Sequence, residues 1–551
     1  MSQIDKLLSA RPWTCVCTYF SAEAFVITLF KTIIPALLLA TSVVAADKVI
    51  IMEDPQKSLN ARTELIMTAT KTIDVQFFII EQDYISIASL AMLRDRARNG
   101  VKIRMIVDSM HNLMTREMMS AFLDNLDSSA SRNIEIREFN NFNLLKPLCY
   151  TRRMHDKSLI IDGKYLIVGD RNVGNSYYNI PEKNGGKELP SYQGVDVLLA
   201  GNNAPAAATQ YFNQRWNSKD VKPAVLYEYS DSKLDYSYCG NESGEGDYSV
   251  CENKRQAAVR KVKFELERLD KHYNTALSKG SFILKTRPLA QELLTAFETD
   301  DIRFIHDDAS TRICAGKNTK NNIAKILYEA VEQNTKKELI IISPYIVVTS
   351  EMELLIRKLV GNGVAVRILT NSIISNDVSS ASAAYLKTRQ RLMQIKNNQG
   401  ENGVKIYEFT SVAAPTLRDA EGIIIKHGKA VATLHAKVVI MDNSKIFIGS
   451  YNWDYRSQDL NSEVGVIIGL TGTKTSGPVV DLRNRVSHLL AEGKLVRDDG
   501  TTDGAYQSKI VLSEKEQQDL KVIIDERLEG VEKALRTLSI PILGELYLKQ
   551  H

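Results

Sequence analysis

The chain has 551 residues, of which 44% are apolar and 25% are charged, an ordinary composition for a globular protein. Its length predicts about three to four domain-sized units. The formal net charge of +4 is small for this length, which argues against a strongly basic nucleic-acid-binding protein.

The N-terminal residues are typical of an export signal. Basic residues precede the apolar run 32–46, and residues 44–46 (Val-Ala-Ala) fit a small-residue cleavage site before Asp47. The run is shorter than the ~20 residues that a membrane-spanning helix needs. We therefore predict a cleaved signal peptide over residues 1–46, with an uncleaved anchor as the alternative.

An α/β unit follows, and a second copy of it occurs later in the chain. The first copy is predicted as helix 61–70, strand 73–80, helix 86–98 and strand 101–107. The second copy is predicted as helix 322–332, strand 338–348 and helix 351–360, followed by NGVAVRILTNS (362–372), which mirrors NGVKIRMIVDS (99–109). Alternating helices and strands predict an α/β fold in which helices cover a mixed or parallel sheet.

Each α/β unit leads to the same polar motif between buried strands. The first motif, H-x-K-x-x-x-x-D, is followed by G-x-x-N and a later acid, and its residues are His155, Lys157, Asp162, Gly169, Asn172 and Asp196. The corresponding residues of the second are His435, Lys437, Asp442, Gly449, Asn452 and Glu463, with Ser450 beside the glycine. Side chains at i and i+2 of a strand share a face, so each His and Lys form a working pair, whereas the motif Asp is a structural partner.

The duplicated motif resembles the phospholipase D superfamily. RRMHDKSLIIDGKYLIVGDRNVGNSYYN and TNSIISNDVSSASAAY are similar to stretches of its bacterial cardiolipin-synthase-like branch, and the resemblance runs from about residue 60 to about residue 470. It implies a phospholipase D-like fold. Asp170 departs from the small residue common at its position, occupied by Ser450 in the second copy.

The residue types suit phosphodiester chemistry without a metal or another cofactor. One imidazole attacks phosphorus and forms a phosphohistidine, while the other protonates the leaving alcohol. The resemblance favours His155 as the nucleophile and His435 as the acid and base. Asp196 and Glu463 are the candidates to orient the imidazoles. The lysines and asparagines of the motifs, and Ser450, are candidates to hold the phosphate oxygens.

These roles require both motifs at one site. We therefore predict two similar lobes, each a mixed, mostly parallel sheet flanked by helices, that face each other about a pseudo-two-fold axis. We predict five regions: leader 1–46, first lobe 47–214, connector or insertion 215–315, second lobe 316–490 and helical tail 491–551. Cys239 and Cys251 bracket a polar loop in the connector and could form a disulfide or remain free thiols.

The resemblance implies phosphatidyl transfer of the cardiolipin synthase type, acting on phospholipid at a membrane surface. With the leader, it places the protein in the bacterial periplasm, at the periplasmic face of the inner membrane, or outside the cell. Because both motifs lie in one chain, we expect a monomer and no nucleic-acid partner. The alternatives are a phospholipase D that releases phosphatidic acid, a phosphodiesterase nuclease, and a non-catalytic binding protein.

Overall fold

The computed structural model describes most of the chain after residue 45. The described residues are 46–124, 126, 131–142, 144, 149, 151–178, 183–184, 187–188, 191–224, 248–279, 288–308, 322–373, 375–409, 411–413, 416–418, 424–427, 430–442, 444–470, 494–497 and 528–534. The predicted signal peptide therefore lies outside the described residues, apart from Ala46. The predicted boundaries of the five regions stay predictions.

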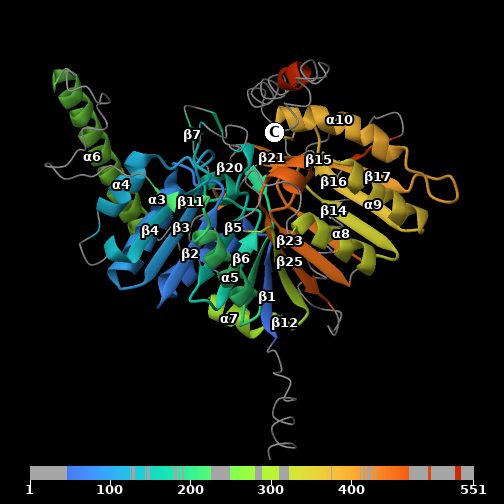
Figure 1. Ribbon diagram of the computed structural model, residues 1–551, viewed down its shortest axis with the longest axis horizontal. Helices are drawn as coiled ribbons and strands as arrows, with labels where there is room; N and C mark the ends of the chain where they lie inside the picture. The colour runs from blue at the N-terminus through green and yellow to red at the C-terminus, as the bar shows by residue number, and fades with distance from the viewer. Residues whose placement is uncertain are drawn as a thin grey trace, which may run out of the picture. The chain divides into compact units, whose positions relative to one another are not determined.

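The first sheet is mixed and has nine strands (Figure 1). In sheet order they are β11 (Val221–Pro223), β4 (Ile134–Phe139), β3 (Lys102–Asp108), β2 (Thr72–Phe77), β5 (Lys157–Ile161), β6 (Tyr165–Gly169), β10 (Asp196–Ala200), β1 (Asp47–Met52) and β12 (Phe297–Thr299). Strands β2, β3 and β4 run parallel, since helices carry the chain back between them. The helices of this part of the chain are α2 (Pro55–Thr68), α3 (Tyr84–Arg98), α4 (Arg116–Asp124) and α5 (Ala204–Trp216).

The second sheet has eight strands. They are β13 (Ile302–His306), β25 (Val464–Gly469), β23 (Lys445–Gly449), β22 (Val438–Met441), β14 (Glu338–Ile342), β16 (Ala365–Asn371), β17 (Val404–Phe409) and β26 (Lys494–Leu495). Its helices are α8 (Ile323–Asn334), α9 (Ser350–Gly361) and α10 (Ser379–Met393). Here β14, β16 and β17 run parallel, as β2, β3 and β4 do in the first sheet.

The two sheets repeat one strand order. The order β4-β3-β2-β5-β6-β10 of the first sheet corresponds to β17-β16-β14-β22-β23-β25 of the second, with the same pattern of parallel and antiparallel pairing. The mixed α/β fold is therefore confirmed. The share of parallel pairing is smaller than expected, because a short turn joins β5 to β6 and another joins β22 to β23, and strands joined by a tight turn pair antiparallel.

Strands such as β22 and β25 are apolar along their whole length because both sheet faces are covered. In β5, Leu159 and Ile161 pack in a cluster with α2 and α3, whereas Ile160 packs in a cluster that contains side chains of both sheets. In β22, Val439 faces α8 and α9, and Ile440 joins the same shared cluster. The inner faces of the two sheets thus share one core, and helices cover the outer faces.

The connector region contributes strands to both sheets, which its sequence did not predict. Strand β12 pairs with β1 of the first sheet, and β13 pairs with β25 of the second. Helix α6 (Tyr248–Lys279) packs against α3 and α4, as Figure 1 shows. Asp270 of α6 binds Arg94 at 2.9 Å, and Lys261 binds Glu117 at 3.1 Å. A short helix, α7 (Leu289–Leu294), follows.

Shorter pieces complete the described structure. The remaining strands are β7 (Lys183–Asn184), β8 (Lys187–Glu188), β9 (Ser191–Gln193), β15 (Ile346–Val347), β18 (Ser411–Ala413), β19 (Thr416–Arg418), β20 (Ile424–His427), β21 (Ala430–Leu434) and β24 (Trp453–Asp454). Residues 528–534 are helical, and Val531 and Ala534 pack on Ala383 and Ala384 of α10. Across the described residues, every helix is too short or too polar to cross a membrane.

Cys149, which is buried in the first lobe, is disulfide-bonded. The expected pairing of Cys239 with Cys251 falls outside the part of the chain whose side chains are described.

Candidate active site

His155 is held by residues of the opposite lobe. It lies two residues before Lys157, the first residue of β5. Its backbone N–H donates to the carbonyl oxygen of Ser462 at 2.9 Å. Its Nδ1 lies 2.9 Å from Oε2 and 3.1 Å from Oε1 of Glu463, which immediately precedes β25. The first motif therefore takes its carboxylate from the second lobe.

His435 makes the reciprocal set of contacts. Its backbone N–H donates to the carbonyl oxygen of Gln193 at 2.8 Å, and its Nδ1 lies 3.2 Å from Oδ1 of Asp170. Both partners belong to the first lobe. Each imidazole is thus bound through Nδ1 to a carboxylate of the other lobe, which leaves Nε2 for chemistry.

The strands beside each motif fix the chain in front of the histidine. Oδ2 of Asp108, the last residue of β3, accepts from the backbone N–H of Met154 at 3.1 Å. Oδ1 of Asn371, the last residue of β16, accepts from the backbone N–H of Leu434 at 2.8 Å. The repeated sequences 99–109 and 362–372 therefore end in residues that position the two histidines.

Two lysine ammonium groups are buried at the site. Lys157 and Lys437 are each 1% exposed. Their Nζ atoms donate to the carbonyl oxygens of His155 and His435 at 2.7 and 2.6 Å. An ammonium group has three N–H donors, so each lysine retains the capacity to bind an anion.

The charges of the two motifs act on one another. Burial and the ammonium groups of Lys157 and Lys437 lower the pKa of both histidines well below its usual value. Burial likewise lowers the pKa of Lys157 to about 7 and of Lys437 to about 8, against the attraction of nearby carboxylates. Since each lysine influences the histidine of the other lobe, the four groups share one site. An anion bound there would favour the protonated lysines.

Glu463 is fixed by hydroxyl groups. Ser450 donates to Oε2 at 2.5 Å, and Ser457 donates to Oε1 at 2.7 Å. Burial raises the pKa of Glu463, while Lys157 and the two hydroxyls oppose that shift. The structure thus directs the hydroxyl of Ser450 to Glu463, although the sequence suggested a contact with phosphate.

The two motif asparagines differ in their surroundings. The side-chain amide of Asn172 donates to the hydroxyl of Tyr177 at 2.7 Å, and its oxygen accepts from the backbone N–H of Ile79 at 3.3 Å. The buried side-chain oxygen of Asn452 has no hydrogen-bond partner among the residues that the structure describes.

The motif glycines lie where strands approach closely. A Cβ atom built on Gly169 would clash with the side chain of Asp196, and one on Gly449 would clash with the carbonyl oxygen of Val464. Only glycine fits at these two positions without displacing backbone or a buried carboxylate.

The motif aspartates stabilise turns away from the histidines. Asp162 and Asp442 have positive φ values of 54° and 48°, in a region that Asp tolerates better than most residues. The carboxylate of Asp162 accepts from the backbone N–H groups of residues 70–72, and that of Asp442 from those of residues 336–338. Each aspartate therefore ties its hairpin to the start of the neighbouring strand.

Asp196 does not face an imidazole, contrary to our expectation. Its carboxylate accepts from Ser58 at 2.6 Å and from both Arg62 and Arg171 at 3.0 Å. Leu198, two residues along β10, packs in the cluster covered by α2, and alternation directs Asp196 toward the same helix. The carboxylate that faces His435 is therefore Asp170.

Comparison with known proteins agrees with this architecture. A family model described as "Cardiolipin synthase, PLD-like domain" matches residues 63–184 and 328–475, which contain both motifs. The chain belongs to the phospholipase D superfamily. It is 29% identical over 443 residues to cardiolipin synthase C of Escherichia coli, covering 78% of this chain and 82% of the relative.

Other relatives of this phospholipase D superfamily member carry related names. A cardiolipin synthase of Halalkalibacterium halodurans is 23% identical over 431 residues, which cover 77% of this chain and 63% of that protein. The crystal structure of phosphatidylserine synthase of Haemophilus influenzae matches with a TM-score of 0.54 at 15% identity, covering 92% of this chain and all of the other. At this identity the structural likeness shows the fold alone.

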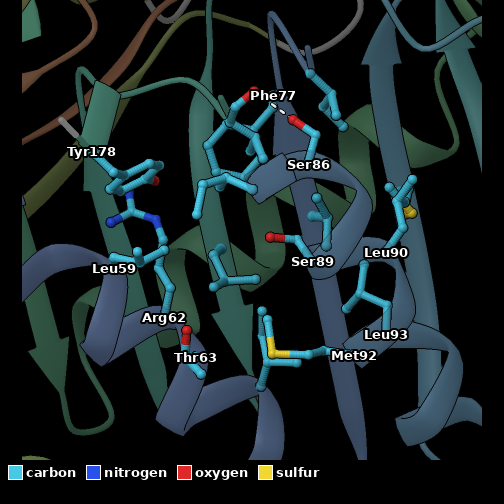
Figure 2. Close-up of a pocket in the computed structure, with 17 residues that line it drawn as sticks. Leu59, Arg62, Thr63, Phe77, Ser86, Ser89, Leu90, Met92, Leu93 and Tyr178 are labelled. Carbon is cyan, nitrogen blue, oxygen red and sulfur yellow. Dashed lines mark hydrogen bonds between the residues drawn. The ribbon is translucent and has the colours of Figure 1, made fainter. Parts of the chain in front are cut away.

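A cavity in the first lobe is separate from the histidines of the phospholipase D-like site. Figure 2 shows it between α2 and α3, and its volume is about 50 Å³. Most of the side chains that line it are apolar, and Arg62 and Tyr178 also line it. Arg62 lies 5.8 Å from the centre of the Tyr178 ring and also binds Asp196. The cavity therefore adjoins the structural network of Asp196, and neither motif histidine lines it.

Proposed function

We propose that the protein is a phosphatidyltransferase that passes a phosphatidyl group through a phosphohistidine at His155. Membership in the phospholipase D superfamily makes it a phosphatidyltransferase or phosphodiesterase. One observation carries the proposal. Two histidines, each bound through Nδ1 to a carboxylate of the opposite lobe, share a site with two buried lysines.

In the first step, Nε2 of His155 attacks phosphorus. The Nδ1–H of the neutral ring donates to Glu463, so the lone pair lies on Nε2. The lowered pKa of His155 keeps the ring neutral and nucleophilic at neutral pH. A P–N bond forms as the P–O bond to the leaving alcohol breaks, and His435 donates a proton to that alcohol.

The phosphate charge would prepare His435 for this role. Burial and the two lysines lower the pKa of free His435. A bound phosphodiester anion offsets the positive charge of the lysines and thereby raises that pKa. The remaining N–H groups of Lys157 and Lys437 hold the non-bridging oxygens as charge shifts in the transition state.

In the second step, His435 acts as the base. It takes a proton from an incoming alcohol, whose oxygen attacks the phosphohistidine, and the P–N bond breaks to regenerate His155. We propose a second phospholipid or a glycerol-type alcohol as acceptor, because the relatives include proteins named cardiolipin synthase. If water were the acceptor, the product would be phosphatidic acid.

We further propose that the protein works as an exported monomer at a membrane surface. Both motifs lie in one chain, so a second copy is not needed to complete the site. The disulfide at Cys149 supports an oxidising compartment, since disulfides persist in exported proteins and are rare in the cytosol.

The test combines product analysis with trapping of the intermediate. Purified protein is incubated with phosphatidylglycerol vesicles, with and without phosphatidylethanolamine and glycerol, and lipid products are measured by mass spectrometry. We expect cardiolipin or a new phosphatidyl ester. If phosphatidic acid were the sole product, the enzyme would be a hydrolase and not a transferase. The absence of any lipid product under all conditions would refute the proposal.

A phosphatidyl adduct on His155 should form in wild type during turnover and be absent from His155→Ala, whereas His435→Ala should slow both steps, because it lacks the acid of the first step and the base of the second. The adduct is sought by peptide mass spectrometry after an alkaline quench, since phosphohistidine is acid-labile. Lys164→Met, in the exposed turn between β5 and β6, is the matched control for Lys157→Met. We expect the control to retain activity and Lys157→Met to lose it.

A further inference from the structure

Each lobe places one carboxylate beside the histidine of the other lobe, but the two carboxylates come from different positions in the repeated fold. Gly169 pairs with Asp196 in the first lobe, and Gly449 pairs with Gly465 in the second. Counting from these pairs, Asp170 corresponds to Ser450, and Gly194 corresponds to Glu463. The first lobe thus has an acid where the second has a serine, and a glycine where the second has the acid.

Hydrogen bonds support this correspondence. The backbone N–H of Val195 donates to Oδ2 of Asp170 at 2.6 Å. In the second lobe, the backbone N–H of Val464 donates to the hydroxyl of Ser450 at 3.0 Å. Asp170 therefore makes the strand contact that Ser450 makes, and its second oxygen, Oδ1, is left for His435.

The space at this point admits one carboxylate. A Cβ atom built on Gly194 would clash with Oδ1 of Asp170, the same atom that faces Nδ1 of His435. In the second lobe the side chain of Glu463 occupies the corresponding place, and Ser450 is small enough to lie beneath it and donate to it. An acid at position 170 thus requires glycine at position 194, and an acid at position 463 requires a small residue at position 450.

We infer that Asp170 is the positioning residue of His435. Either pair of residues, Asp170/Gly194 or Ser450/Glu463, can supply the carboxylate that orients a motif histidine, so the two pairs are interchangeable. This inference rests on the proposed function for its catalytic consequence. Its structural part, a carboxylate that selects the Nδ1–H tautomer of His435, holds whether or not the substrate is a phospholipid.

The exchange can be tested by rescue. Asp170→Asn keeps the shape of the side chain but replaces the charged acceptor with an amide. We expect kcat to fall by about 10²–10⁴-fold with little change in KM, as for loss of the carboxylate that orients a catalytic imidazole. Asp170→Ser should lose a similar factor. The double variant Asp170→Ser/Gly194→Glu copies the second lobe and should recover to within about tenfold of wild type.

The pH profile separates this role from a merely structural one. Loss of the carboxylate lowers the pKa of His435, so the alkaline limb of kcat moves to lower pH in the single variants and returns in the double variant. Asp170→Asn with wild-type kcat and pH profile would refute the inference, even if the double variant did not fold. A folded double variant as inactive as Asp170→Ser would refute interchangeability.

Nitrogen NMR of labelled histidine distinguishes failure of this inference from failure of the proposed function. In the substrate-free protein we expect the Nδ1–H tautomer of His435 in wild type and in the double variant, and a loss of that preference in Asp170→Ser. An unchanged tautomer in all three would overturn the positioning role. Absence of lipid transfer by wild type, with the expected tautomers, would overturn only the proposed function.

Discussion

The hydroxyl of Ser457 donates to Oε1 of Glu463 at 2.7 Å, from a π-helical turn, Arg456–Leu460, that lies between Asn452 and Glu463 of the second motif. π-Helical turns are rare and often lie at functional sites. This turn supplies a donor to the carboxylate that binds His155. The position of the His155 ring therefore depends on a residue that the motif pattern does not include.

Ser457→Ala should lower kcat by about tenfold to a hundredfold, because a buried carboxylate loses a hydrogen bond of about 1.5–3 kcal/mol. Ser450 still donates to Glu463, so the loss should be smaller than that of Glu463→Gln. Steady-state kinetics with Ser444→Ala as the control measures the effect, because Ser444 bonds a backbone carbonyl of the β22–β23 turn. Equal rates for both variants would contradict a role for Ser457.

Substrate capture should weaken as the pH rises through about 7 to 8. Burial lowers the pKa of Lys157 to about 7 and of Lys437 to about 8, and only the protonated forms attract a phosphate. Below these values both ammonium groups are present, so kcat/KM should fall on the alkaline side. The alkaline limb of kcat, which reflects His435 and the lysines in the bound complex, should lie at higher pH, because bound phosphate raises the pKa of all three groups. Coincident alkaline limbs would contradict this account.

Lys157→Met should abolish activity and stabilise the fold. The pKa of Lys157 is lower in the folded protein than the usual value of 10.5, so folding disfavours its protonated form. That cost is full below about pH 7 and disappears as pH approaches 10.5. We expect Tm to rise by a few degrees at pH 6 and by less at pH 9. Calorimetry at both pH values checks this, and a lower Tm at pH 6 would contradict it.

Asp442→Ala should destabilise the second lobe with little effect on kcat per folded molecule. The variant removes the acceptor of three backbone N–H groups and places alanine at a positive φ. We expect a loss of about 1–2 kcal/mol, since the carboxylate is largely solvated. Burial raises the pKa of Asp442, but the hydrogen bonds from these N–H groups outweigh burial and hold the pKa below its usual value. The stability that the Asp442 carboxylate contributes is therefore lost as pH falls through that pKa. Urea unfolding at pH 7 and pH 3 measures both effects.

The sequence predicts the elements whose signal is repeated along the chain. The histidines and lysines recur with the same spacing in two copies, and the helix–strand order before them recurs as well. Both copies fold as the same strand order, and both His–Lys pairs meet at one site. Repetition was informative because each lobe must bury the same kind of apolar strand.

The carboxylate partner of His435 could not be assigned in this way. The residues that follow Asp196 in β10 are apolar, because this strand is buried on both faces. Alternation along the strand therefore does not say which face of it meets the site. Asp170 was noticed as a departure, but its contact depends on the strand register between β6 and β10. Ser457 carried no signal, since the corresponding turn of the first lobe, Asn175–Tyr178, is a 3-10 turn with Tyr177 at the equivalent position.

The crossed contacts of His155 with Glu463 and of His435 with Asp170 make the lobes depend on each other. A fragment that ends between the lobes would carry an intact motif and still lack the acid that its own histidine uses. Two inactive full-length chains, one altered in each lobe, could not restore activity by mixing unless they exchanged whole lobes. A substitution at either carboxylate should therefore act on the histidine of the other half.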